Sequence, residues 1–152
     1  MKYQLYREQQ LQCTIENAWN FFAAAKNIFK ITPEEMHFKL LSSLENDIIC
    51  EGMTIDYSVA PLFGIPLRWT TEILEVVHQK SFTDIQKRGP YKIWHHRHDF
   101  IANENGVLMI DTVDYELPLG KLGDWMHHLI VKDKITDLFE YRQNKIHNIL
   151  DL

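Results

Sequence analysis

The sequence predicts an α+β domain in which a curved antiparallel sheet of about seven strands packs against one long C-terminal helix. Period-two alternation of apolar and polar residues recurs between residues 38 and 117, as it does in half-buried strands. Turn signals separate these segments, and such hairpins place neighbours in sequence beside each other in a sheet. From residue 121 the apolar spacing changes to three and four residues, which indicates a helix.

The composition is that of an ordinary soluble protein. The 152 residues are 45% hydrophobic and 24% charged, so we expect one domain, residues 1–152, with a substantial core. A net charge of −5 without a basic block argues against nucleic acid as a partner. No apolar run reaches the ~18 residues of a membrane span, and the N-terminus lacks the pattern of a signal peptide. Cys13 and Cys50 are isolated, which favours reduced thiols in a cytoplasmic protein.

The N-terminal part of the chain predicts one strand and two short helices. Residues 2–12 alternate as a strand does. Thr14 can then cap a helix with Glu16 in its first turn, near the partial positive charge of the helix start. A second short helical piece covers residues 28–31 and ends at Thr32, because a residue before proline avoids the helical region.

Six further strands and a long helix complete the prediction. The expected strands cover residues 38–42, 53–59, 69–73, 82–86, 94–100 and 109–117. Asn105–Gly106 gives the strongest hairpin signal, because both residue types tolerate positive φ. The helix is expected over 121–150, with a bend where Lys132–Lys134 interrupts its apolar stripe. The stripe consists of Leu122, Trp125, Met126, Leu129, Leu138, Phe139, Ile146 and Ile149.

The strand that contains three histidines is the most informative segment. Trp94, His96, His98 and Phe100 share one face. The opposite face carries His95, Arg97 and Asp99. A strand that separates rings from charges is half buried, and a buried imidazole needs a hydrogen-bond partner. The pattern therefore predicts a buried polar network or the wall of a pocket.

We expect a polar cluster on the inner face of the three strands between residues 82 and 117. It combines the side chains of Asp84, Gln86, His96, His98 and Asp111. Neighbouring strands lie about 4.8 Å apart, so side chains from three successive strands can touch. The assignment depends on register, because a single β-bulge moves the side chains to the other face.

Four interpretations of this cluster stay open. It is a satisfied network that fixes strand register, the polar end of an apolar ligand cavity, or a His–Asp pair for acid–base catalysis. A metal is the fourth, since His96 and His98 are two residues apart, and Asp84 or Asp111 is available as a third ligand. Because no cysteine joins them and no other metal motif occurs, we expect no metal and no cofactor, and we assign no catalytic residue.

Nearly the whole chain resembles the SRPBCC superfamily, which includes START domains and birch-pollen-allergen-like proteins. It is most similar to small bacterial ligand-binding proteins described as polyketide cyclase-like or as cell-division inhibitors. The resemblance implies a helix-grip fold, with two short helices between strands one and two. It does not fix an activity, because the superfamily includes lipid carriers, receptors, cyclases and hydrolases. The matching segments are 31–33, 36–38, 51–57, 69–73, 82–86, 89–91, 94–100, 111–115 and 139–142.

We expect a non-catalytic carrier or sensor that binds a small hydrophobic or amphipathic molecule between sheet and helix, as a monomer or homodimer. The expected ligand contacts are Tyr57, Trp69, Asp84, Gln86, Trp94, His96, His98, Phe100, Asp111, Val113, Tyr115, Trp125, Met126 and Leu129. One alternative is a cyclase, dehydratase or hydrolase with His96 or His98 as its base. The other alternative is a protein-interaction module with a closed core.

Overall fold

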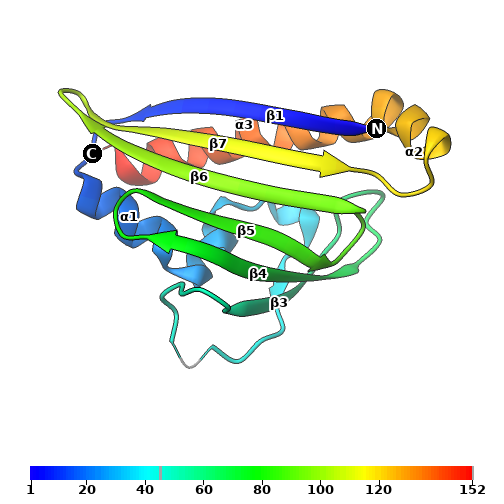
Figure 1. Cartoon of the computed structure of the whole chain (residues 1–152), viewed down its shortest axis with the longest axis horizontal. Helices are drawn as coiled ribbons and strands as arrows, with labels where there is room; N and C mark the ends of the chain where they lie inside the picture. The colour runs from blue at the N-terminus through cyan, green and yellow to red at the C-terminus, as the bar shows by residue number, and fades with distance from the viewer. Residues whose placement is uncertain (45, 152) are drawn as a thin grey trace.

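The computed structural model describes residues 1–44 and 46–151, which form an antiparallel sheet of seven strands and several helices (Figure 1). The sheet order is β1-β7-β6-β5-β4-β3-β2. The strands are β1 (Lys2–Leu11), β2 (Lys39–Leu40), β3 (Thr54–Val59), β4 (Leu67–Val77), β5 (Ser81–Arg88), β6 (Ile93–Asn103) and β7 (Gly106–Glu116). The helices are α1 (Ile15–Ala23), the 3₁₀ turns η1 (Ala25–Ile31) and η2 (Glu34–Met36), α2 (Lys121–Met126), the π-helical η3 (His127–Val131) and α3 (Lys132–Leu150).

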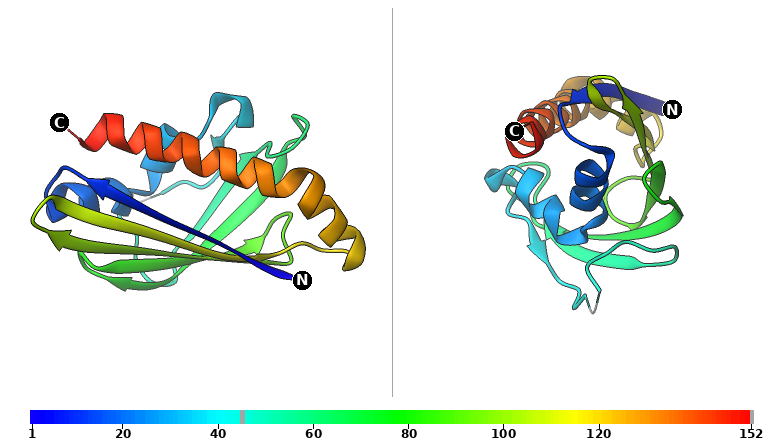
Figure 2. Two further views of the ribbon diagram at one scale, coloured as in Figure 1. Left: turned by 90° about the horizontal axis from the view of Figure 1, so that it is seen from above. Right: turned by 90° about the vertical axis from the view of Figure 1, so that its left-hand side faces the viewer.

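The sheet curves around the C-terminal helix, as Figure 2 shows from two directions. The helix α3 runs along the concave face and contacts β1 and η1, while α1 packs against β6 and η1. A curved sheet that holds a long helix in this way is the helix-grip arrangement, so the predicted α+β fold class is confirmed. No helix among the described residues is both long and apolar enough to cross a membrane.

The expected N-cap of the first helix is present. The Thr14 side chain accepts a hydrogen bond from the backbone N–H of Asn17 at 3.1 Å, and Glu16 lies in the first turn. The apolar stripe of α1 then places Ala18 and Trp19 in the core against the concave face. The cap therefore fixes where α1 begins, and α1 closes one end of the curved sheet.

The hairpin between β6 and β7 forms one residue earlier than the sequence predicts. Asn103 pairs with Gly106, so the turn residues are Glu104 and Asn105. Gly106 has a φ of 123°, and a Cβ at this position would clash with the carbonyl oxygen of Leu11. The glycine is needed because the end of β1 passes close beside the hairpin.

Every strand differs from its predicted bounds, and two of the differences change how the sheet pairs. The expected strand over residues 38–42 pairs only over Lys39–Leu40, because Leu41 and Ser42 both donate their N–H groups to the single carbonyl of Asp56. The strand expected over 69–73 extends as β4 and carries two register shifts against β5. Such irregularities increase twist and help the sheet to curve.

The C-terminal helix is not continuous in the way that the periodicity predicts. The π-helical segment η3 lies just before the expected bend and shifts the face that points inward. Phe139 and Ile146 on α3 are buried as the stripe predicts, whereas Trp125 is 61% exposed and Leu129 is 54% exposed. A stripe extended through a π turn therefore assigns the wrong face to its N-terminal half, which includes Leu122.

Candidate functional site

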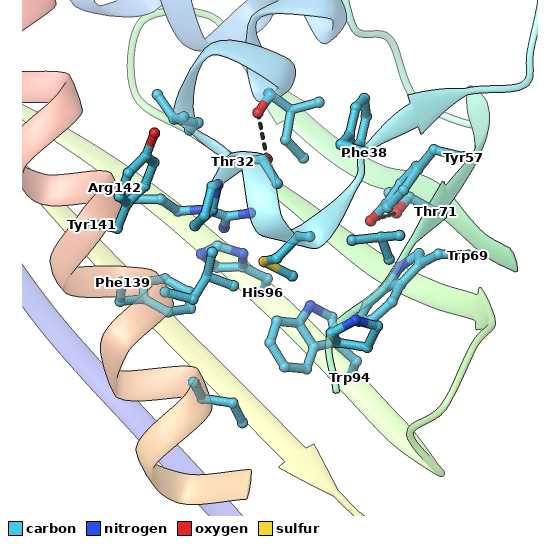
Figure 3. A pocket seen from close by; sticks show the side chains of 18 of the residues that line it. Thr32, Phe38, Tyr57, Trp69, Thr71, Trp94, His96, Phe139, Tyr141 and Arg142 are labelled. Carbon is cyan, nitrogen blue, oxygen red and sulfur yellow. Dashed lines mark hydrogen bonds between the residues drawn. The ribbon is translucent and has the colours of Figure 1, made fainter. Parts of the chain in front are cut away.

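A partly open cavity of about 770 Å³ lies between the concave face of the sheet, α3 and the segment η1–η2 (Figure 3). Aromatic rings form one wall. Trp69 and Trp94 meet edge to face with ring centroids 5.4 Å apart, and Tyr57 stacks on Trp69 at 6.1 Å. Helices α1 and α3 and the η segments supply mainly aliphatic and aromatic side chains, such as Phe22, Ile31, Met36, Ile135 and Ile146.

A polar cluster interrupts the apolar lining on the strands β5, β6 and β7. Asp84 is the cross-strand neighbour of His96, and Asp111 is the cross-strand neighbour of His98. The hydrogen bonds run diagonally: His96 Nε2 lies 2.8 Å from Asp111 Oδ1, and His98 Nε2 lies 3.0 Å from Asp84 Oδ2. The strand alternation thus brings two carboxylates and two imidazoles to one place, as the sequence predicts.

His98 also approaches the second carboxylate. Its Nδ1 lies 3.0 Å from Asp111 Oδ1, although this contact lacks the direction of a good hydrogen bond. The ring of His98 stacks on the ring of Phe82, with centroids 4.1 Å apart, and its centroid lies 3.7 Å from that of His96. His98 is therefore held between Asp84, Asp111 and an aromatic face.

The carboxylates decide the charge of His98. Burial lowers the pKa of this imidazole, but hydrogen bonds and charges of Asp111 and Asp84 outweigh burial and raise the pKa to about 9. Burial likewise opposes the charge on Asp84 and Asp111, yet the two histidines hold the pKa of both carboxyls below the ordinary value. At neutral pH the core of the cluster is an imidazolium between two carboxylates.

His96 differs from its neighbour. Burial lowers its pKa, and the charge on His98 lowers it further, so the ring is neutral at neutral pH. A neutral His96 donates its Nε2–H to Asp111, which leaves Nδ1 as an acceptor. Nδ1 has no hydrogen-bond partner among the described residues, and His96 lines the cavity. A ligand can therefore hydrogen-bond to this nitrogen without breaking a bond within the cluster.

Arg142 is a further polar residue of the cavity. It extends from α3 into the cavity towards His96 (Figure 3), and its Cζ lies 5.3 Å from the centre of the Phe139 ring. Sequence reasoning did not select Arg142, because a charged residue on a helix is by default a surface residue. Its spacing of three from Phe139 and four from Ile146, both on the buried stripe, is the signal that could have placed it inside.

Asp84, His96 and His98 offer ligand atoms that all lie within 4.8 Å of one another, so they are the residues that could hold a metal. The Nε2 atoms of both histidines already face carboxylates at 2.8 and 3.0 Å. A cation bound by His98 would have to displace one of its carboxylate contacts and the proton that gives His98 its charge. The geometry fits a self-satisfied cluster better than a metal centre.

The structure places half of the predicted ligand contacts on the cavity wall. The residues that line it are Tyr57, Trp69, Asp84, Trp94, His96, His98 and Asp111. As contacts of a ligand these seven stay predictions. Sequence reasoning did not select the lining residues between β1 and β3, because they lie on short helices and loops without a clear period.

The other seven lie elsewhere, each for a physical reason. Phe100 and Val113 are fully packed in the core beside α1 and the sheet, and Gln86 closes the β5–β6 turn by bonding the backbone of Tyr91. Tyr115 hydrogen-bonds His127. Trp125 and Met126 on α2 and Leu129 within η3 lie outside the lining, and Trp125 and Leu129 are exposed.

The architecture is similar to that of several solved structures. A protein from Chromobacterium violaceum has a TM-score of 0.74 at 10% identity over 98% of each chain. The major latex-like protein 151 of Panax ginseng has a TM-score of 0.68 at 13% identity, over 100% of this chain and 99% of that one. A nucleoside-diphosphate sugar epimerase from Corynebacterium glutamicum has a TM-score of 0.65 at 19% identity, over 95% of this chain and 28% of the epimerase.

No protein-family model matches the chain, and no curated protein matches it. At these low identities the structural likeness shows the fold alone. Fold and site together define a helix-grip protein with an internal cavity.

Proposed function

We propose that the protein binds a small hydrophobic or amphipathic molecule in the cavity and acts as a non-catalytic carrier or sensor. The observation that carries this proposal is a cavity of about 770 Å³ whose mainly apolar wall has one polar end. Ligand pockets in proteins span about 300–1,000 Å³ and have this composition. The apolar wall would supply affinity by burial, and the polar cluster would orient one end of the ligand.

The size of the burial effect is sufficient for useful affinity. Removing about 200 Å² of apolar ligand surface from water is worth about 5 kcal/mol at 25 cal/mol per Å². The cost of immobilising the ligand reduces this figure, so the polar contacts matter for the final affinity. His96 Nδ1 is one acceptor that the cluster leaves available for such a contact.

Binding is preferred to catalysis for a chemical reason. The His96–Asp111 pair has the arrangement of a general base that a carboxylate orients. However, the lining among the described residues contains no serine or cysteine that His96 could activate as a nucleophile, and the neighbouring imidazolium of His98 lowers the basicity of His96.

A closed interaction module is disfavoured because the cavity is large and partly open. Both cysteines are free, which supports a cytoplasmic location.

Titration with the neutral fluorescent dye Nile red tests the proposal. We expect saturable binding to the wild type and at least about fivefold weaker binding to Leu138→Trp, because an indole would occupy the cavity beside α3. Asn144→Trp on the exposed face of the same helix is the matched control and should bind like the wild type. Both variants need unchanged melting temperatures. Absence of saturable binding, or equal weakening by both substitutions, would reject an internal site.

A further inference from the structure

The guanidinium of Arg142 is a charge on the cavity wall that has no counter-ion among the described residues. Among the described residues, no carboxylate oxygen lies within the ion-pair distance of 4.0 Å of its nitrogens, and its buried Nε has no hydrogen-bond partner. Its Cζ lies 5.3 Å from the centre of the Phe139 ring, and that ring in turn lies 5.6 Å from the ring of His96. Arg142 therefore borders both the apolar volume and the polar cluster.

The carboxylates of the polar cluster are already paired with histidines. Asp84 hydrogen-bonds His98, and Asp111 hydrogen-bonds His96 and lies 3.0 Å from Nδ1 of His98. Burial lowers the pKa of Arg142, and the negative charges of Asp111 and Asp84 only partly oppose this effect. A guanidinium stays protonated in such surroundings, so it is left with unused donors in a poorly hydrated place.

We infer that Arg142 binds the anionic head group of an amphipathic ligand, a monoanion such as a carboxylate, while the apolar body lies against the wall of Tyr57, Trp69 and Trp94. This inference rests on the proposed function and specifies its ligand class. The planar fork of arginine matches a carboxylate with two parallel hydrogen bonds. A dianion is disfavoured because Asp84 and Asp111 are close enough to influence the charge of Arg142.

Competition among three amphiphiles of equal chain length tests the inference. Dodecanoate, dodecanol and dodecylamine would each displace Nile red at about pH 8, where the carboxylate and the ammonium are both ionised. For the wild type we expect dodecanoate to bind about tenfold more tightly than dodecanol, and dodecylamine to bind most weakly. Equal affinity for acid and alcohol, or a preference for the amine, would overturn the inference.

Two variants of α3 make the test specific. Arg142→Gln should abolish the preference for the acid and leave dodecanol affinity within about twofold. Lys145→Gln removes the same charge from the exposed face of α3 and should keep the preference. If Arg142→Gln retains the tenfold preference, the inference is wrong.

A readout besides ligand affinity separates anchoring from a structural role. Without ligand, Arg142→Gln should melt no lower than Lys145→Gln, because no protein ion pair is lost. If Arg142→Gln fails to fold, Arg142→Lys replaces it in the test. Lysine keeps the positive charge but lacks the two parallel N–H donors of the guanidinium, so the preference for the acid should fall severalfold. If none of the three amphiphiles displaces the dye from any protein, the proposed function itself fails.

Discussion

Two buried histidines in this protein differ in charge at neutral pH: His98 is protonated and His127 is neutral. His98 on β6 lies with its ring nitrogens 3.0 Å from Asp84 and 3.0 Å from Asp111. His127 in η3 instead hydrogen-bonds the hydroxyl of Tyr115 at 2.8 Å and stacks on the ring of Tyr3 at 3.5 Å. Both rings are buried, so burial does not explain the difference.

The groups around each ring explain the difference in pKa between His98 and His127. Carboxylates raise the pKa of His98 to about 9 against the effect of burial. Burial and the charges of His128 and Lys132 lower the pKa of His127, and Asp124 opposes them only in part. The cavity cluster is thus a fixed ion pair, whereas the neutral ring of His127 attaches η3 to β1 and β7. Carboxylates on neighbouring strands are what make a buried imidazole a permanent charge.

The largest effect is expected from His98→Phe. A phenyl ring can keep the stacking on Phe82, but it leaves Asp84 and Asp111 as buried carboxylates with fewer partners. Breaking a buried pair in this way costs about 3–5 kcal/mol of unfolding free energy. Urea unfolding at neutral pH measures it. His95→Phe, on the outer face of the same strand, is the control and should change stability by less than about 0.5 kcal/mol.

The pH dependence should distinguish the two sites by its sign. Because the folded-state pKa of His98 is raised to about 9 from 6.5, its stabilisation is complete below pH 6.5 and is lost as the pH rises through 9. The groups that face it do not titrate in this window, because Asp84 and Asp111 stay ionised, His96 stays neutral and Arg142 stays charged. The loss should be on the order of 3 kcal/mol.

Unfolding free energies of the wild type and His98→Phe, compared between about pH 6 and pH 9.5, test this prediction. The difference between the two proteins should shrink as the pH rises. His127 acts in the other direction: its lowered pKa means that its contribution is lost as the pH falls below 6.5. A difference for His98→Phe that is independent of pH would show that His98 is neutral in the folded protein.

The smallest effect is expected from His127→Phe. The phenyl ring keeps the stack on Tyr3 and removes the unpartnered Nδ1, but it leaves the Tyr115 hydroxyl without its partner. These changes nearly cancel, so stability at about pH 8 should change by less than about 1 kcal/mol. A loss as large as that of His98→Phe would mean that the neighbours of His127 matter as much as an ion pair.

The cavity cluster was predictable from sequence, and the His127 site was not. Alternation on three neighbouring strands is enough to bring Asp84, Asp111 and the two histidines of β6 together, because side-chain period and antiparallel pairing are both local rules. The contact of His127 with Tyr3 joins the two ends of the chain through a π turn. No periodicity in the sequence predicts a π turn, so the sequence-based prediction placed the wrong face of α2 towards the cavity.

The position of Arg142 also depends on a tertiary feature that periodicity does not predict. Sequence-based reasoning assigns a charged helical residue to the surface, because most are found there. Here α3 crosses a hollow instead of a filled core, so a long charged side chain fits beside Phe139. How much space remains between sheet and helix depends on sheet curvature and on the bulges of β4, which are tertiary features.

Nitrogen NMR of the histidine rings during titration with dodecanoate tests the central claim most directly. In the free protein at neutral pH, both ring nitrogens of His98 should be protonated, while His96 and His127 should be neutral. Added dodecanoate should shift the His96 and His98 resonances saturably and leave those of His127 unchanged. Saturable binding that moves His127 but not His96, or no saturable change at either site, would contradict a ligand site between the sheet and α3.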